Sequence, residues 1–423
     1  MSAPLFRTVT PMGTEVLVET LPHVRSCSVG FWVKRGSCQE GRLEEGLAHF
    51  IEHTVFKGTE AFPTPEVMAA ATDRLGGHLD AFTGKETACF YGKVLKEQLP
   101  DLLALLGDLV TRPLFDPEEV MRERGVILEE IAQSEDTPDD WVSELFYGNF
   151  WAGGPLAHSI LGRPEQVETY GAEEARSFFQ RTYRAPNLLI AAAGDIEPQA
   201  FMQMLQPHLD RLPGGDPEPE PAQGDTSRFV LNVPRRDLQQ AFLVMGFPCG
   251  GHLDPDRAAV GLLSHVLGGG MSSRLFMELR EKRALCYQVG SYPSPYRQTG
   301  ALQITASGAN ERARELVQRT LAECDRLARH GVTQEELDRA KLQARTGLVF
   351  GQESASSRMF TLAHQAIHMD RILGLDAMVA EIDKVTLDDL DRVAREVLKP
   401  ERFSVTALGT RRGSEIRKRD LVL

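Results

Sequence analysis

The sequence predicts an α+β protein made of two similar halves, each a mainly antiparallel sheet with helices packed on one face. Strand-like segments occur in series with amphipathic helical segments in both halves. The stretch from Asp210 to Arg228 holds four prolines and almost no apolar side chain, which is typical of a linker. On either side of it the chain repeats itself. The segment from Phe115 resembles the one from Val332, and the segment from Gly46 resembles the one from Ala259 at nearly the same offset.

These observations divide the chain into residues 1–210, a linker over residues 211–228, and residues 229–423. Each half is long enough to bury a core of its own. An ancestral duplication explains the similarity of the halves, and the alternative is a coincidence of two common helical patterns.

The elements of the first half follow from local patterns. Strands are expected where β-branched and aromatic residues alternate or cluster, at Glu15–Glu19, Ser28–Val33 and Glu86–Val94. A capping threonine and a proline predict a helix that begins after Thr64 and ends at Gly76. The same capping pattern predicts a longer helix from Asp116 to about Ser134.

Composition excludes several classes of function. The 47 basic and 60 acidic side chains give a net charge of −13, which is the wrong sign for binding nucleic acid. No window approaches the roughly 18 consecutive apolar residues of a membrane helix, and the first residues lack the features of a signal peptide. The six cysteines are scattered without a CxxC pair. We therefore expect a cytoplasmic protein with reduced thiols and no membrane partner, in which any metal is held by histidine and carboxylate.

The pentapeptide His49-Phe50-Ile51-Glu52-His53 is the strongest local motif. Histidines four residues apart on a helix lie on one face, so both imidazoles can reach a single ion. Glu52 lies on nearly the same face and can contact a water at that ion. This HxxEH order is that of the inverted zinc peptidases. The alternative is a partly buried helical turn with two hydrogen-bonded histidines.

A catalytic zinc needs a third protein ligand, and the helix from Asp116 offers several glutamates. Glu123 and Glu130 are two turns apart and share a face, whereas Glu129 lies about 100° away. The spacing favours Glu130 as the ligand and Glu123 as a carboxylate that orients a histidine or a water. The alternative is that these glutamates form a solvated acidic face.

The second half provides an internal comparison. The five candidate residues are His49, Glu52, His53, Glu123 and Glu130. Only His53 aligns with a residue of the same type in the second half, His265, and the other four align with Gly261, Ser264, Ala340 and Gly347. A requirement of the scaffold would be present in both copies, so the pattern indicates a site carried by the first half. A second histidine pair, His364 and His368, has no acidic residue between its members, and we interpret it as structural.

Taken together, these residues make the sequence resemble the M16 family of zinc metallopeptidases, which includes pitrilysin, insulin-degrading enzyme and the mitochondrial processing peptidase. It is most similar to the bacterial M16B members of about this length. The resemblance implies the metallopeptidase M16/LuxS-like fold and a zinc metalloendopeptidase with one Zn²⁺ per chain. It implies that His49, His53 and Glu130 hold the zinc, that Glu52 is the general base and that Glu123 assists.

Two further segments carry the resemblance. GGHLDAFTGKETACFY from Gly76 is similar to the family's edge strand, which pairs with the substrate backbone. The implied substrate-binding residues are Leu79, Asp80, Ala81, Phe82 and Thr83. Asp80 stands where the family usually has asparagine, which puts a side-chain hydrogen bond of that residue in question. SRLFMELREKRALCYQVGSY from Ser273 is similar to the segment whose arginine and tyrosine face the zinc, and it implies catalytic roles for Arg280 and Tyr287.

We therefore expect an endopeptidase that hydrolyses peptides or unfolded polypeptide segments inside a dimeric chamber. Single-chain relatives enclose a chamber with four domains, so the resemblance implies a homodimer for this chain. The alternative is a non-catalytic or partner-dependent subunit like those of the processing peptidase. Such relatives lose the HxxEH residues or the opposing Arg and Tyr, and this chain keeps both sets. A metal-storage or sensing role would not require Glu52.

Overall fold

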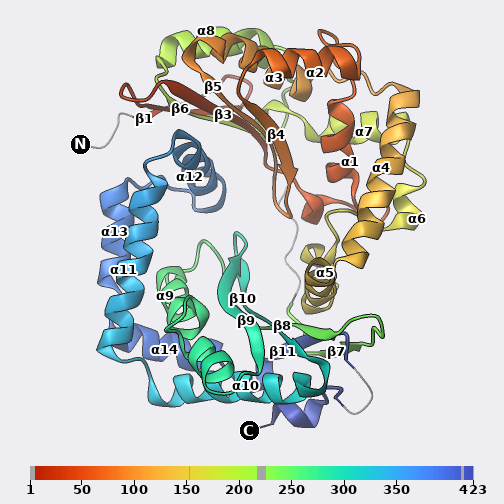
Figure 1. The fold of residues 1–423 in the computed structure, drawn as a ribbon. Coiled ribbons are helices and arrows are strands. Elements are labelled where there is room, and N and C mark those ends of the chain that lie inside the picture. The colour runs from red at the N-terminus through yellow and green to blue at the C-terminus, as the bar shows by residue number, and fades with distance from the viewer. Residues whose placement is uncertain (1–4, 152, 217–224, 411–413, 423) are drawn as a thin grey trace. The chain divides into compact units, whose positions relative to one another are not determined.

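The computed structural model describes residues 5–151, 153–216, 225–410 and 414–422 (Figure 1). Residues 217–224 of the expected linker lie outside the described residues. The chain forms two compact units. Neither unit coincides with one half of the chain, because each unit includes a segment from the half that forms most of the other unit. The first unit comprises Met1–Gln133, His158–Ala222 and Phe350–Ile372, and the second comprises Ser134–Ala157, Gln223–Val349 and Leu373–Leu423.

The first unit contains a six-stranded sheet in the order β1-β2-β6-β3-β5-β4. Neighbouring strands are antiparallel except for the parallel pair of β2 and β6. Strand β4 is the last in this order and pairs with β5. The strands are β1 (Leu5–Val9), β2 (Glu15–Thr20), β3 (Ser26–Val33), β4 (His78–Thr83), β5 (Ala88–Leu95) and β6 (Leu188–Gly194).

Most helices of the first unit lie on one face of this sheet (Figure 1). Alternate strand residues such as Val16, Val18 and Phe31 point to that face and join the apolar sides of the helices in one core. These helices are α1 (Leu47–Val55), α2 (Pro65–Arg74), α3 (Leu99–Thr111), α4 (Pro117–Asp136), α6 (Pro164–Val167), α7 (Ala172–Thr182) and α8 (Pro198–Leu209).

Helix α12 (Ala355–His368) covers the opposite face of the same sheet (Figure 1). Leu17, Trp32 and Leu189 point to this face and pack with Met359 and Leu362 of α12. Ser356 exchanges a hydrogen bond of 2.9 Å with buried Ser28, and Arg358 pairs with Glu19, 3.0 Å from Nε to Oε2. The predicted α+β class is confirmed, but this sheet, like that of the second unit, has helices on both faces rather than on one.

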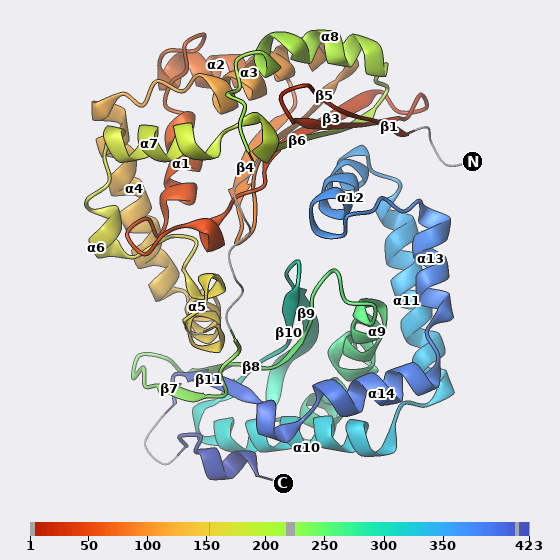
Figure 2. The same cartoon turned by 180° about the vertical axis from the view of Figure 1, so that it is seen from behind.

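The second unit contains a five-stranded sheet in the order β7-β11-β8-β10-β9, antiparallel except for β7 and β11. Helix α5 (Pro138–Phe150) lies against β8 and β11 on one face, and α9, α10 and α14 cover the other (Figure 2). The strands are β7 (Val230–Val233), β8 (Gln240–Gly250), β9 (Cys286–Pro295), β10 (Thr299–Ala309) and β11 (Ser404–Leu408). The remaining helices are α9 (Arg257–Gly268), α10 (Ala313–His330), α11 (Gln334–Gly351), α13 (Leu375–Lys384) and α14 (Leu387–Val397).

The two sheets share one topology. Without β1, the first sheet reads β2-β6-β3-β5-β4, and each strand has a counterpart at the same place in the second sheet. In the first sheet β6 runs parallel to β2, and in the second sheet β11 runs parallel to β7. Both β6 and β11 come from the end of their repeat. In the same way α5 and α12 occupy matching places in the chain, and each packs on the sheet of the other half.

Two chemical expectations concern the whole chain. All six cysteines are free thiols, as their spacing suggests. Among the described helices, none is both long and apolar enough to cross a bilayer.

The packing of α12 gives a first prediction. Met359 is fully buried between α12 and the sheet, so Met359→Ala leaves a cavity that should lower the free energy of opening α12 by about 2–4 kcal/mol. Hydrogen exchange of the α12 amides measures this opening. Thr361→Ala is the matched control, because the Thr361 hydroxyl bonds to the Ser357 carbonyl within the helix. Equal exchange in the two variants would contradict the burial of Met359.

Candidate metal centre

Helix α1 is fixed at its N-terminus by a buried carboxylate. Glu40 Oε2 accepts from the Gly46 N–H at 2.8 Å, and Oε1 accepts from the Ala48 N–H at 2.7 Å. These N–H groups begin the helix and have no carbonyl partner within it. Gly46 has a φ of +92°, and a Cβ there would lie 2.7 Å from the Cα of Gly162. The start of α1 therefore requires both a capping acid and a glycine.

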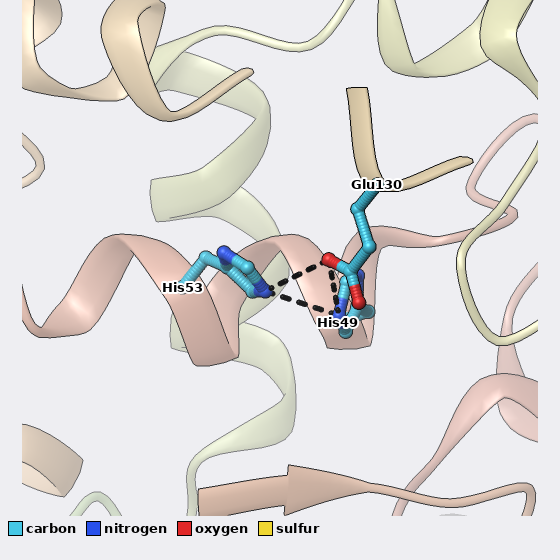
Figure 3. Close-up of side chains that lie close together, drawn as sticks. All are labelled: His49, His53 and Glu130. Carbon is cyan, nitrogen blue, oxygen red and sulfur yellow. Dashed lines mark hydrogen bonds and ion pairs between the residues drawn. The ribbon is translucent and has the colours of Figure 1, made fainter. Parts of the chain in front are cut away.

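The polar face of α1 meets α4 at a compact group of three side chains (Figure 3). The Nε2 atoms of His49 and His53 are 3.1 Å apart. Glu130 Oε2 lies 3.6 Å from His49 Nε2 and 3.4 Å from His53 Nε2. We call His49, His53 and Glu130 the metal-ligand group. In the described part of the chain, no other set of three His, Cys, Asp or Glu side chains comes together in this way.

The spacing of these atoms fits zinc. A tetrahedral zinc with bonds of about 2.0–2.2 Å needs ligand atoms about 3.3–3.6 Å apart, close to the three separations found here. Two imidazole nitrogens and one carboxylate oxygen are also a donor set that zinc uses in catalytic sites. The metal-ligand group would thus hold one zinc ion.

A second carboxylate orients His53. The Nδ1–H of His53 donates to Glu123 Oε1 at 2.9 Å, which leaves Nε2 to face the other two ligands. Glu123 is buried, and its Oε2 accepts from the Lys57 ammonium at 2.7 Å. Lys57 is not part of the HxxEH motif, although its place four residues after His53 puts it on the same side of the chain.

Burial and charge set opposite pKa values for the two histidines. Burial, together with the neighbouring charge of His53, lowers the pKa of His49 to about 4. Burial also disfavours the charged form of His53, but hydrogen bonds to Glu123 and Glu130 outweigh it and raise the pKa of His53 to about 9. At neutral pH and without metal, His49 is neutral and His53 carries the proton.

Glu52 lies beside the metal-ligand group without belonging to it. Burial raises the pKa of its carboxyl group, while a hydrogen bond from Thr83 lowers it, and the net shift is upward. The Thr83 hydroxyl donates to Glu52 Oε2 at 2.6 Å. Glu129 is exposed on α4, whereas Glu130 is the residue that the structure brings to the histidines.

Strand β4 carries the five expected substrate-binding residues along the edge of the sheet. Leu79 and Ala81 pack against the core on the α1 side. Phe82 is 38% exposed on the other side, near the rings of Tyr91 and Phe360. Asp80 accepts from the Tyr91 hydroxyl at 3.2 Å and from the backbone N–H of Ala81.

Arg280 and Tyr287 lie together in the second unit. The Arg280 guanidinium is 4.9 Å from the centroid of the Tyr287 ring, and Tyr287 is 77% exposed. Because they belong to the second unit and the metal-ligand group belongs to the first, a role at the zinc stays a prediction. The other two histidines, His364 and His368, lie on α12, and His368 Nδ1 is 3.2 Å from Glu86 Oε2.

The proteins similar to this chain are described as M16 peptidases or zinc proteases. Residues 15–164 match the family model described as "Insulinase (Peptidase family M16)", and residues 170–344 match "Peptidase M16 inactive domain". An uncharacterized zinc protease of Streptomyces coelicolor is 34% identical over 410 residues, which are 95% of this chain and 89% of that protein. The uncharacterized zinc protease YmxG of Bacillus subtilis is 33% identical over 391 residues, which are 91% of this chain and 93% of YmxG.

Solved structures show the same fold. A protease from Helicobacter pylori has a TM-score of 0.89 and 22% identity, covering 96% of this chain and 99% of its own. A Pseudomonas fluorescens protein described as a peptidase M16 inactive domain also has a TM-score of 0.89, at 21% identity, covering 96% of this chain and 98% of its own. The resemblance and the fold expected from the sequence are confirmed.

The pKa values predict how metal uptake depends on pH. Zinc binds neutral imidazole. At pH 7.5 His49, with its lowered pKa of about 4, is already neutral, whereas His53, with its raised pKa of about 9, must first lose a proton. Zinc uptake at pH 7.5 should therefore release about one proton, and zinc affinity should rise by about tenfold per pH unit from pH 6.5 to 8.5. Calorimetry in buffers of different ionisation enthalpy measures the release. A pH-independent affinity over this range would show that the assigned protonation of His53 is wrong.

Proposed function

The chain belongs to the M16 peptidase family, and from this membership and the site geometry we propose that it is a zinc-dependent endopeptidase with one zinc per chain. The observation that carries the proposal is the meeting of His49, His53 and Glu130 with Glu52 beside them. A metal-storage site would need the first three residues alone. A base next to the ligands supports hydrolysis.

The chemistry divides between the metal and the chain. When bound, zinc would supply Lewis acidity toward a scissile carbonyl and a water molecule. Glu52 accepts a proton from the attacking water and later donates it to the leaving amine. Its raised pKa makes it a stronger base than an exposed glutamate. Glu123 and Lys57 keep His53 in the orientation that presents Nε2.

The substrates that we propose are peptides and unfolded polypeptide segments. Strand β4 is the last strand of its sheet, and an extended peptide can add to such an edge through backbone hydrogen bonds. Folded substrates have no free strand to offer. The free thiols support a reducing compartment, and we place the protein in the cytoplasm.

We further propose that the enzyme works as a homodimer with a chamber formed by both copies. The M16 resemblance supports this assembly, since Arg280 and Tyr287 would act on the zinc of the partner chain. There they would donate hydrogen bonds to a substrate carbonyl or to the oxyanion that forms from it. A non-catalytic, partner-dependent subunit is the alternative, and the presence of Glu52 and of the complete metal-ligand group argues against it.

Glu52→Gln tests the assignment of the base. The amide preserves size but cannot accept the proton, so peptide hydrolysis should fall at least about 10²-fold while zinc content stays at one per chain. Mass spectrometry of the metal and cleavage of a fluorogenic peptide measure the two quantities. Glu129→Gln is the control, because Glu129 is exposed on α4 next to Glu130. This substitution should leave both peptide hydrolysis and zinc content unchanged. Loss of zinc from Glu52→Gln would instead make Glu52 a ligand.

The shared site gives a prediction about mixed dimers. A dimer of one Glu52→Gln chain and one Tyr287→Phe chain has one site with both lesions and one site with neither. Co-expressed heterodimers, purified through two different tags, should recover activity approaching half that of wild type, although each parent homodimer is inactive. Heterodimers as inactive as their parents would reject a site shared between chains.

A further inference from the structure

Thr83 lies where the edge strand β4 meets the helix that carries the HxxEH residues. Side chains alternate between the two faces of a strand, so Leu79, Ala81 and Thr83 share one face of β4. Leu79 and Ala81 pack against the core on that face. The alternation therefore directs the Thr83 side chain toward α1, while its backbone completes the last pair of the ladder, opposite Ala88.

The contact between Thr83 and Glu52 is short and partly buried. The 2.6 Å separation of Thr83 Oγ1 and Glu52 Oε2 is within the range of a charge-assisted O–H···O⁻ bond. A hydroxyl has one proton to donate, so the bond selects one carboxylate oxygen and fixes the rotation of the group. Oε2 carries this hydrogen bond, which leaves Oε1 free of the Thr83 hydroxyl.

We infer that Thr83 is a positioning residue that links the substrate strand to the base. The Thr83 backbone forms the end of the docking edge, and the Thr83 hydroxyl orients Glu52. A peptide that adds to β4 is thereby aligned with the Glu52 carboxylate, which acts as the base in its hydrolysis. This inference rests on the proposed peptidase function, and it adds a residue that acts through Glu52 rather than on the substrate bond.

A purely structural role for the hydroxyl predicts a different behaviour. If the bond merely satisfies a partly buried carboxylate, its loss should affect stability and leave turnover unchanged. A positioning role instead lowers kcat and leaves KM unchanged, because the docking edge itself is intact.

The kinetic test compares three variants of the zinc-loaded protein. Thr83→Val keeps the β-branched shape without the hydroxyl and should lower kcat about tenfold or more, with KM within about twofold of wild type. Thr83→Ser restores the hydroxyl and should recover most of kcat. Thr87→Val makes the same chemical change four residues later, at a buried position in the turn between β4 and β5, and should leave kcat unchanged. Zinc content should be the same in all three variants.

A second readout does not depend on activity. In the zinc-free protein, Thr83→Val should accelerate hydrogen exchange of the β4 amides severalfold, and it should add no acceleration when Glu52→Ala is already present. Equal acceleration in both backgrounds would overturn the inference, as would a Thr83→Val enzyme with normal kcat or a loss that Thr83→Ser does not recover. If the wild-type protein with zinc cleaves no peptide, the proposed function itself fails and the inference fails with it.

Discussion

The two hydrogen bonds from the backbone of Gly46 and Ala48 to Glu40 determine where helix α1 begins, and the site depends on that position. A helix of nine residues is short, and its stability comes from its caps and its packing. Leu47, Phe50 and Ile51 hold one side of α1 in the core, so the opposite side must present His49, Glu52 and His53 together. A slip of one residue at the cap would rotate this face by about 100° and separate the histidines from Glu130.

Around α1 the charges of Glu123 and His53 are compensated by neighbouring groups. Burial alone would raise the pKa of Glu123, but its bonds to His53 and Lys57 outweigh this and lower it. The same carboxylate helps to keep the proton on His53 when no metal is present. A zinc ion in the metal-ligand group would replace that proton as the positive charge, so the surrounding carboxylates would keep a cationic partner in both states. Lys57 and Glu123 would thus prepare the site for a metal without contacting it.

Much of this arrangement follows from helix periodicity alone. The i,i+4 spacing of His49 and His53 and the seven-residue spacing of Glu123 and Glu130 determine which side chains share a face, and the structure brings these same residues together. Contacts between distant segments do not follow from spacing. The bond from Thr83 to Glu52 joins residues 31 apart, and the bond from Ser28 to Ser356 joins residues 328 apart. One sign of the covered second face was present in the sequence, because the uninterrupted apolar run of β6 is typical of a strand buried on both sides.

The second half shows that the fold itself does not require the metal-ligand group. Gly261 on α9 and Gly347 on α11 stand where the repeat would place His49 and Glu130, and a Cβ added at either glycine would meet no atom within 4 Å. Each glycine costs its helix about 1 kcal/mol relative to alanine, so stability does not explain them. His265 remains, and burial lowers its pKa, as expected for a neutral side chain packed in a helix. Since the same strand order forms with and without these side chains, the demands of the scaffold do not account for their presence in the first half.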